Sequence, residues 1–294
     1  MLQGAILVVL DGTDKLGLVL GLAQDNGFTI TQMKTVRSGS AGISVALEIQ
    51  GKQSIDAWKR TVESYSLSGT VSVASVASDG SAQYDAIFGK GSPKLYAPSS
   101  ANVTLCIVKP HVVKEGKAGA LIRKIQEVGF GVRGGDLWYF ISRKISRAID
   151  LTDRASERTN ERTNELIPPP APLIPKPQGF EYQVLSATVV HMSPASIEEF
   201  AAVYKGAINS DEYCGMAKEL ASGQAVVLAL TKAGVGNVVD AFRASCGPYI
   251  VPIAKKVQPN SLRGTFGRST SQNAVHCTDL PNEGVLECDF FFRL

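Results

Sequence analysis

Long hydrophobic runs, histidines and paired cysteines are all scarce in this chain. The longest apolar runs, such as Ala5–Leu10 and Ala225–Leu230, are far shorter than the roughly 20 residues that span a bilayer, so we expect no membrane partner. No basic segment precedes the first run, which argues against a signal peptide. The five cysteines are odd in number and form no Cys-x-x-Cys pair, which argues against a disulfide scaffold and a zinc site. We therefore expect a cytoplasmic, reducing compartment.

The composition allows a substantial core but no strong charge-based recognition. Of the 294 residues, 44% are hydrophobic, which is ample for a folded chain of one large or two small domains. The formal net charge is only +3, from 30 Lys and Arg against 27 Asp and Glu. Such a mild excess gives no footprint for specific nucleic-acid binding.

Residues 1–92 have the patterns of a small domain with mixed helices and strands. Asp14 can cap the first helix and Gly27 can end it. A stretch rich in Gly, Ser and Pro follows, so we place a linker at 93–101. The expected elements are strands over Gly4–Leu10, Phe28–Val36, Ile43–Ile49 and Val71–Ala77, and helices over Lys15–Asn26 and Ser54–Tyr65.

Residues 102–294 repeat the same opening order of strand, turn, helix and Gly-Phe. Leu16-Gly17 with Gly27-Phe28 is echoed by Ala118-Gly119 with Gly129-Phe130, which indicates internal duplication. The expected elements are strands over Val103–Val108, Tyr182–His191, Gln224–Leu230 and Leu286–Phe292, and helices over Gly119–Val128, Ser196–Tyr204, Asp211–Leu220 and Val235–Ala244.

A segment at 131–179 interrupts this second stretch. It contains a tandem Glu-Arg-Thr-Asn repeat over 157–164 and the proline-rich run Pro168–Pro172. Such a composition cannot bury enough apolar surface to fold alone, so we expect an inserted segment that is mostly disordered, with at most a short helix over Leu137–Leu151.

The most informative of the three histidines is His276, which lies in Asn-Ala-Val-His-Cys-Thr-Asp (273–279). A neutral imidazole can attack phosphorus while a carboxylate orients the ring and guanidinium and amide groups hold the phosphate oxygens. The alternative is an ordinary loop histidine with satisfied hydrogen bonds. No Cys/His cluster has metal-ligand spacing, so no protein-held metal site is expected.

Several ordered motifs resemble those of the nucleoside diphosphate kinase family. They are Lys109-Pro110-His111 after a strand, Ser222-Gly223-Gln224-Ala225-Val226, Phe242-Arg243, the segment Ser261–Gly267 and the His276 segment. The resemblance covers 102–294 apart from the insertion. It implies an α/β chain, in detail an α+β sandwich, with two ferredoxin-like domains whose four-stranded antiparallel sheets carry helices. The first domain would be a degenerate, truncated copy.

The resemblance also implies a reaction and its residues. A nucleoside triphosphate, ATP with Mg²⁺, would phosphorylate the histidine, which would then phosphorylate a nucleoside diphosphate. The ion would be held mainly by the nucleotide phosphates. The implied roles are His276 as nucleophile, Lys109, Arg243, Arg263 and Asn273 as phosphate or ribose contacts, Tyr204 beside the histidine, Glu287 as its orienting carboxylate and Thr278 as a supporting hydroxyl.

Other positions depart from the family pattern. No histidine occurs before His111, so the first half lacks a nucleophile and is expected to be structural, packed on the second half within the chain or as part of a homo-oligomer. Glu212 stands where the family has a base-stacking aromatic, and Tyr249 where it has a threonine. These changes put nucleotide affinity in question.

The alternative function is a non-catalytic structural one. Tandem-domain members of the family are associated with γ-tubulin complexes and ciliary axonemes. The resemblance to them implies tubulin or a γ-tubulin complex as a partner, and a cytoskeletal place at a cilium, flagellum or centrosome. In that case the kinase fold would serve only as a scaffold.

Overall fold

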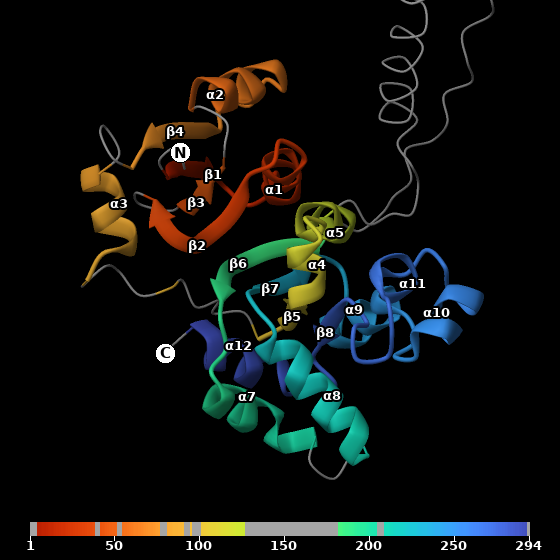
Figure 1. Cartoon of the computed structure of the whole chain (residues 1–294). Coiled ribbons are helices and arrows are strands. Elements are labelled where there is room, and N and C mark those ends of the chain that lie inside the picture. The colour runs from red at the N-terminus through yellow and green to blue at the C-terminus, as the bar shows by residue number, and fades with distance from the viewer. Residues whose placement is uncertain are drawn as a thin grey trace, which may run out of the picture. The chain divides into compact units, whose positions relative to one another are not determined.

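The structure, a computed structural model, describes residues 5–38, 42–51, 55–76, 81–90, 95, 101–126, 182–204 and 209–292 (Figure 1). In its first half the four strands have the order β4-β1-β3-β2, with antiparallel neighbours. This is the ferredoxin-like order, with the first and third strands in the middle. The elements are β1 (Ile6–Asp11), α1 (Leu16–Asp25), β2 (Thr29–Ser38), β3 (Gly42–Gln50), α2 (Ile55–Ser64), β4 (Val71–Ser75) and α3 (Ser81–Phe88).

The second half repeats this strand order and adds helices in its connections. Its strands run β6-β7-β5-β8, again with antiparallel neighbours. The two ferredoxin-like halves expected from the sequence are therefore confirmed. The elements are β5 (Thr104–Val108), α4 (Pro110–Lys114), α5 (Ala118–Gln126), β6 (Tyr182–Val190), α7 (Pro194–Ala201), the 3₁₀ turn η1 (Ala202–Tyr204), α8 (Ser210–Ala221), β7 (Ala225–Lys232), α9 (Val238–Cys246), α10 (Val251–Val257), α11 (Leu262–Phe266), β8 (Val275–Cys277) and α12 (Gly284–Phe292).

The two halves share one eight-stranded sheet, because edge strand β2 pairs with edge strand β6 in antiparallel fashion. Two threonines strengthen this junction. Thr35 Oγ1 donates to Ala187 O at 3.1 Å and accepts from Ala187 N at 2.8 Å. Thr188 Oγ1 donates to Met33 O at 3.1 Å. Each half thus covers the exposed strand edge of the other, which removes a site for non-specific strand pairing.

Helices α1 and α5 meet reciprocally beside this junction. Gln126 Oε1 accepts from Gly17 N, and Gln24 Oε1 accepts from Gly119 N, both at 2.8 Å. Each glutamine thereby satisfies a free N–H in the first turn of the opposite helix. A Cβ on Gly119 would lie 2.1 Å from the backbone N of Gly21, so only glycine allows this approach. The equivalent roles of these residues support the internal duplication.

Two local expectations are wrong. Asp14 does not cap α1, whose N-cap residue is Lys15 without a side-chain cap bond; Gln126 from the other half supplies an acceptor there instead. The last segment is not a strand but helix α12. Its buried residues Gly284, Cys288, Phe291 and Phe292 recur at helical spacing and bury that face in the molecule. The fourth strand of this half is β8, which carries His276.

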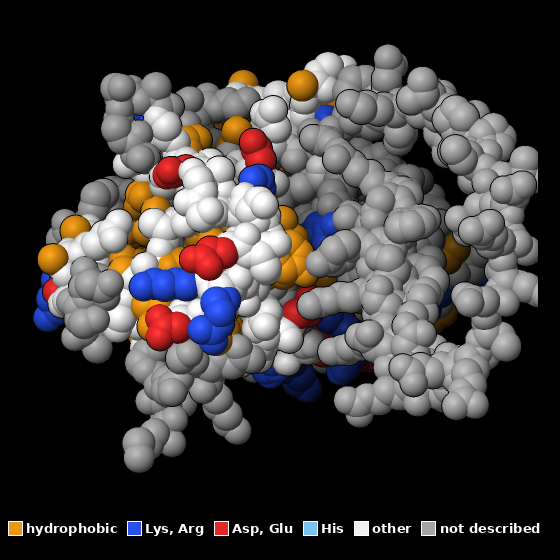
Figure 2. Space-filling view, turned by 90° about the horizontal axis from the view of Figure 1, so that it is seen from above, with side chains coloured by type: hydrophobic (Ala, Val, Ile, Leu, Met, Phe, Trp, Pro, Cys, Tyr) orange, Lys and Arg blue, Asp and Glu red, His pale blue; other side chains and the backbone are white. Residues whose placement is uncertain are grey.

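One face of the molecule shows how its charged side chains are distributed. On the face seen in Figure 2, positive and negative side chains are interspersed with hydrophobic ones and are not gathered by sign. Within the described ranges, no helix has both the length and the apolar character needed to cross a membrane. The expected insertion at 131–179, its helix over 137–151 and all of the linker 93–101 except Leu95 and Ala101 lie outside the described residues.

Candidate active site

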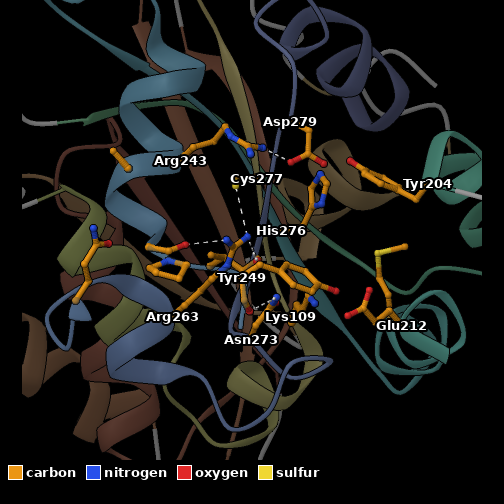
Figure 3. A pocket seen from close by; sticks show the side chains of 16 residues that line it. Lys109, Tyr204, Glu212, Arg243, Tyr249, Arg263, Asn273, His276, Cys277 and Asp279 are labelled. Atoms are coloured by element: carbon orange, nitrogen blue, oxygen red, sulfur yellow. Dashed lines mark hydrogen bonds and ion pairs between the residues drawn. The ribbon is translucent and has the colours of Figure 1, made fainter. Parts of the chain in front are cut away.

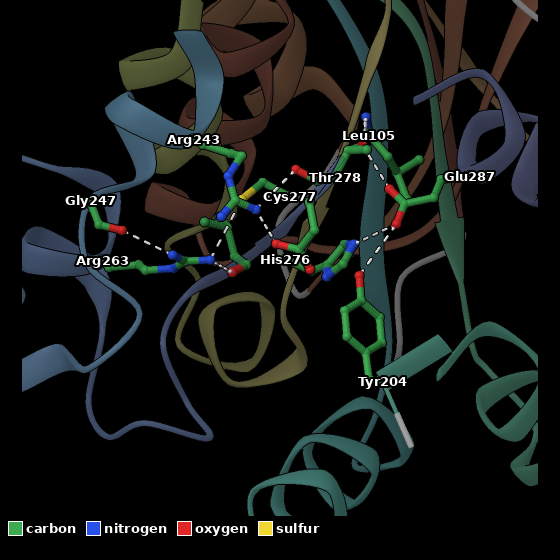
Figure 4. Close-up of polar contacts among 11 residues, drawn as sticks. Leu105, Tyr204, Arg243, Gly247, Arg263, His276, Cys277, Thr278 and Glu287 are labelled. Atoms are coloured by element: carbon green, nitrogen blue, oxygen red, sulfur yellow. Dashed lines mark hydrogen bonds and ion pairs between the residues drawn. The ribbon is translucent and has the colours of Figure 1, made fainter. Parts of the chain in front are cut away.

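His276 occupies the middle of β8, opposite Ile107 of β5 in the sheet. It is 9% exposed. Its Nε2 lies 3.3 Å from Glu287 Oε1, so the carboxylate from α12 fixes one nitrogen of the ring (Figure 4). The rings of Phe200 and Tyr204 approach the imidazole edge-on, at centroid distances of 5.1 and 5.9 Å. The ring is therefore held by hydrogen bonding and packing together.

Glu287 is itself fixed by two hydroxyl groups. Thr278 Oγ1 donates to Glu287 Oε2 at 2.7 Å and accepts from Leu105 N at 2.9 Å. Tyr204 OH donates to Glu287 Oε1 at 3.5 Å. Burial lowers the pKa of His276, but the adjacent Glu287 carboxylate outweighs it and raises the pKa above its ordinary value of 6.5. Glu287 thus sets both the orientation and the proton affinity of the ring.

A cavity of about 510 Å³ opens beside the histidine. It lies between the helices of the second half and the end of β8 (Figure 3). Six of the eight predicted site residues line it: Lys109, Tyr204, Arg243, Arg263, Asn273 and His276. Thr278 and Glu287 lie behind the histidine, as the hydrogen bonds above show. The structure brings all eight residues to one place, although more than 160 residues separate the first from the last.

Lys109 is a buried cation at the base of this cavity. It is 2% exposed, and its Nζ donates to Ser271 O at 2.9 Å. Burial, with repulsion from Arg263, lowers the pKa of Lys109 to about 7. An anion bound in the cavity would restore the positive charge, because it would compensate the cost of burying it.

Arg263 and Asn273 are anchored to backbone and keep unpaired atoms. Arg263 Nη1 donates to Gly247 O at 2.9 Å, while its buried Nε has no hydrogen-bond partner among the described residues. Asn273 Nδ2 donates to Tyr249 O at 3.4 Å, and its buried Oδ1 is likewise unpaired within that part of the chain. Buried polar atoms without partners are costly, which favours a polar ligand here.

Arg243 enters from α9 and forms an ion pair with Asp279, just beyond the histidine segment. This pair is half-exposed, with side-chain exposures of 41% and 42%. Both residues line the cavity, and Figure 3 shows them beside His276. Asp279 was present in the sequence motif but had no assigned role; its place beside Arg243 depends on the fold of β8 and α9.

A buried network missed by the sequence prediction supports the base of the site. Glu219 Oε1 lies 2.8 Å from His111 Nδ1 and accepts from His111 N at 2.9 Å. Its Oε2 accepts from Gln272 Nε2 at 3.0 Å. Although burial opposes it, hydrogen bonding from His111 lowers the pKa of Glu219 to about 2. Helix α8 is thereby tied to the turns that carry Lys109 and Asn273.

The two departures from the family pattern also face the cavity. Glu212 and Tyr249 both line it. The guanidinium carbon of Arg263 lies 5.6 Å from the centroid of the Tyr249 ring, a cation–π contact. Among the described residues, no cluster of three or more His, Cys, Asp and Glu side chains could hold a metal ion.

Comparison with known proteins agrees with this geometry. Residues 176–294 match the nucleoside diphosphate kinase family model. This range includes seven of the eight predicted site residues, all except Lys109. The chain carries a nucleoside diphosphate kinase domain. The resemblance predicted from the motifs is thus confirmed.

Relatives of this kinase domain extend the likeness to both halves. Nucleoside diphosphate kinase homolog 7 of Rattus norvegicus is 25% identical over 340 residues, covering 98% of this chain and 70% of the relative. The nucleoside diphosphate kinase of Roseiflexus castenholzii is 32% identical over 74 residues, or 25% of this chain and 46% of that protein. A solved nucleoside diphosphate kinase from Aquifex aeolicus is 21% identical, covers 65% of this chain and 94% of its own, and has a TM-score of 0.40. The observed strand order, rather than that score, supports the fold.

Proposed function

We propose that the second half transfers the terminal phosphoryl group of a nucleoside triphosphate to a nucleoside diphosphate through phosphohistidine at His276. The observation that carries this proposal is the pairing of His276 Nε2 with Glu287 at the wall of a polar cavity. Membership of the domain in the kinase family supports the reaction class.

In the first step His276 acts as the nucleophile. With the Nε2–H donated to Glu287, the neutral ring carries its lone pair on Nδ1, which no described residue hydrogen-bonds. That lone pair would form the N–P bond to the terminal phosphorus. The bond from phosphorus to the bridging oxygen would break, and its electron pair would leave with the nucleoside diphosphate.

The surrounding cations would stabilise the transferring group. Lys109, Arg243 and Arg263 line the cavity together with the amide of Asn273. Phosphoryl transfer depends mainly on positioning and on stabilising negative charge at the phosphate oxygens, which these groups are suited to do. The substrate is expected to enter as its Mg²⁺ complex, with the ion held mainly by phosphate oxygens.

In the second step the direction reverses. A terminal phosphate oxygen of a new nucleoside diphosphate would attack the phosphorus, and the N–P bond would break. The electron pair would return to Nδ1, while the Nε2–H···Glu287 hydrogen bond would persist through both steps. As the ring gains positive charge during attack on the phosphorus, the carboxylate would stabilise it.

A phosphoryl-exchange assay tests this proposal. Purified full-length chain is mixed with a nucleoside triphosphate and a different diphosphate, and product is measured against time. We expect turnover that is abolished in His276→Ala and retained in His191→Ala, because His191 is exposed at the end of β6, away from the cavity. Equal rates for native protein and His276→Ala would refute the nucleophile assignment.

A second candidate, a non-catalytic scaffold of microtubule structures, is favoured by one observation. The first half retains a ferredoxin-like sheet but has no histidine in its sequence. Likeness to homolog 7 over both halves agrees with a tandem role. If the scaffold proposal is right, the chain will lie at a cilium, flagellum or centrosome and will co-sediment with microtubules or γ-tubulin complexes. The His276→Ala variant will co-sediment to the same extent. Absence of any co-sedimentation would remove this candidate.

A further inference from the structure

The cavity has two chemically different sides. Arg243 and Arg263 lie on one side, and Glu212 from α8 lies on the opposite side (Figure 3). Met216, one turn further along α8, also lines the cavity and is buried. A ligand that fills this space therefore meets cations at one end and a carboxylate beside an apolar wall at the other.

The Glu212 carboxylate is available to a ligand. Among the residues that the structure describes, none hydrogen-bonds it or forms an ion pair with it, and it is partly buried. Its backbone is fixed, because Glu212 N donates to Asn209 Oδ1 at 2.9 Å at the N-cap of α8. An ionised carboxylate only accepts hydrogen bonds, and it can take two parallel ones through its two oxygens.

A nucleobase that suits this group must present two adjacent donors. Guanine does so with its N1–H and its 2-amino group. Adenine and cytosine each place an acceptor nitrogen next to their amino group, and uracil flanks its single N–H with carbonyl oxygens. Opposite a carboxylate, those acceptors would be repelled and left unpaired.

We infer that Glu212 makes this cavity selective for guanine nucleotides, by accepting two hydrogen bonds from the base while the cations hold the phosphates. The inference rests on the proposed nucleotide-binding function but does not require turnover. Glu212 stands where the resemblance implies a base-stacking aromatic residue, so the charged side chain would recognise the base by hydrogen bonding in place of stacking.

Binding measurements on the full chain test the inference. Guanosine, inosine, adenosine, cytidine and uridine diphosphates are titrated calorimetrically at one pH, salt and Mg²⁺ concentration. Inosine keeps the N1–H but lacks the 2-amino group. We therefore expect guanosine diphosphate to bind best, inosine diphosphate less well, and adenosine diphosphate about tenfold or more weakly than guanosine diphosphate.

Two variants separate the carboxylate from its surroundings. Glu212→Gln keeps the shape but replaces one acceptor with a donor, so the preference for guanine should fall to within about twofold. Asp211→Asn removes an exposed neighbouring charge from the same helical turn, outside the cavity, and should retain the full preference. Far-ultraviolet circular dichroism checks that both variants remain folded.

The outcomes are distinct from those that test phosphoryl transfer. Equal affinity for all five diphosphates, no binding of any, or an unchanged preference in Glu212→Gln would each overturn the inference. Guanine-selective binding without a phosphohistidine would support it and contradict the proposed transfer. Phosphohistidine formation with equal use of all bases would support transfer and overturn the selectivity.

Discussion

The two halves of the chain have the same strand order but very different connections. In the first half, only residues 39–41 lie between β2 and β3. In the second half, α7, η1 and α8 separate β6 from β7 and bring Tyr204, Glu212 and Glu219 to the site. Between β7 and β8, helices α9, α10 and α11 add Arg243 and Arg263.

The difference teaches that the sheet alone does not make the site. Both halves contain this sheet, yet most of the side chains that line the cavity come from connections that only the second half possesses. The histidine itself lies on the fourth strand, β8, whereas its counterpart β4 reads Val-Ser-Val-Ala-Ser. The halves therefore differ both in the side chains that their strands carry and in the connections between those strands, consistent with function residing in sites placed on folds.

The largest expected effect concerns the buried carboxylates of the two halves. Glu219→Ala would leave the buried His111 N, His111 Nδ1 and Gln272 Nε2 without their shared partner, which should lower the free energy of unfolding by about 3–5 kcal/mol. In the first half, Glu48 is hydrogen-bonded by neutral groups such as Gln32 Nε2 at 2.8 Å. Glu48→Ala should cost less, about 1.5–3 kcal/mol. Urea denaturation of both variants measures the difference.

The fall in the free energy of unfolding at low pH provides a control for the Glu219 prediction. The pKa of Glu219 in the folded chain, about 2, is below its ordinary value of 4.5. Its stabilising contribution is therefore complete above about pH 4.5 and is lost as the pH falls toward 2. Glu219→Gln should show a shallower decline over this window. An identical decline in native protein and Glu219→Gln would contradict the assigned role.

The next prediction concerns the close contact between α1 and α5 at the junction of the two halves. Gly119→Ala places a methyl group where the backbone N of Gly21 lies only 2.1 Å away, so α1 and α5 must separate. We expect a loss of about 1–3 kcal/mol in the free energy of unfolding. Gly69→Ala is the matched control, because its Cβ would meet no atom within 4 Å. A Gly119→Ala variant as stable as Gly69→Ala would show that the close helix contact contributes nothing.

A smaller effect sharpens the view of the site. Glu287→Gln removes the charge that raises the pKa of His276, so more of the ring is neutral at low pH. Because the neutral ring is the nucleophile, the rise of the phosphorylation rate with pH should move to lower pH. The maximal rate should fall by about tenfold to a hundredfold through poorer positioning. Rapid-quench labelling between pH 5 and 9 measures both, and an unmoved midpoint would argue against the Glu287 assignment.

The smallest effect concerns Lys109. Its pKa of about 7 means that the free protein loses this charge as the pH rises through neutrality. Diphosphate affinity should then weaken by about threefold to tenfold between pH 6 and 8. In Lys109→Arg the guanidinium stays charged, so that dependence should disappear. Calorimetric titrations across this range test it, with equal pH dependence in both proteins as the contrary result.

Much of this arrangement could be predicted from particular residues. Alternation located β3, and the repeated Gly-Phe pairs revealed the duplication. The separate motifs that contain Lys109, Arg243 and Arg263 identified the cations that line the cavity. The pattern could not distinguish the apolar Leu286–Phe292 from a strand, because its helical face is defined only by packing in the folded molecule. Asp14 does not cap α1, and the acceptor for Gly17 N comes instead from Gln126, which lies 109 residues further along the chain.

Long-range polar contacts explain what else was missed. Nothing in the local sequence pairs His111 with Glu219, which are 108 residues apart. The same holds for Arg243 and Asp279, which meet only when α9 packs near β8. Short β8 itself has three residues and no alternation long enough to indicate a strand. Tertiary packing, and not local propensity, decides these features.

Mapping the phosphoenzyme tests the central claim that one half of this duplicated fold carries the chemistry. Full-length chain is incubated with a γ-labelled nucleoside triphosphate, digested, and the labelled peptide is identified. The account predicts an acid-labile, alkali-stable label on the His276 peptide, close to one per chain, and none in residues 1–92. Label in the first half, label that survives His276→Ala, or a folded chain that takes up no label would contradict it.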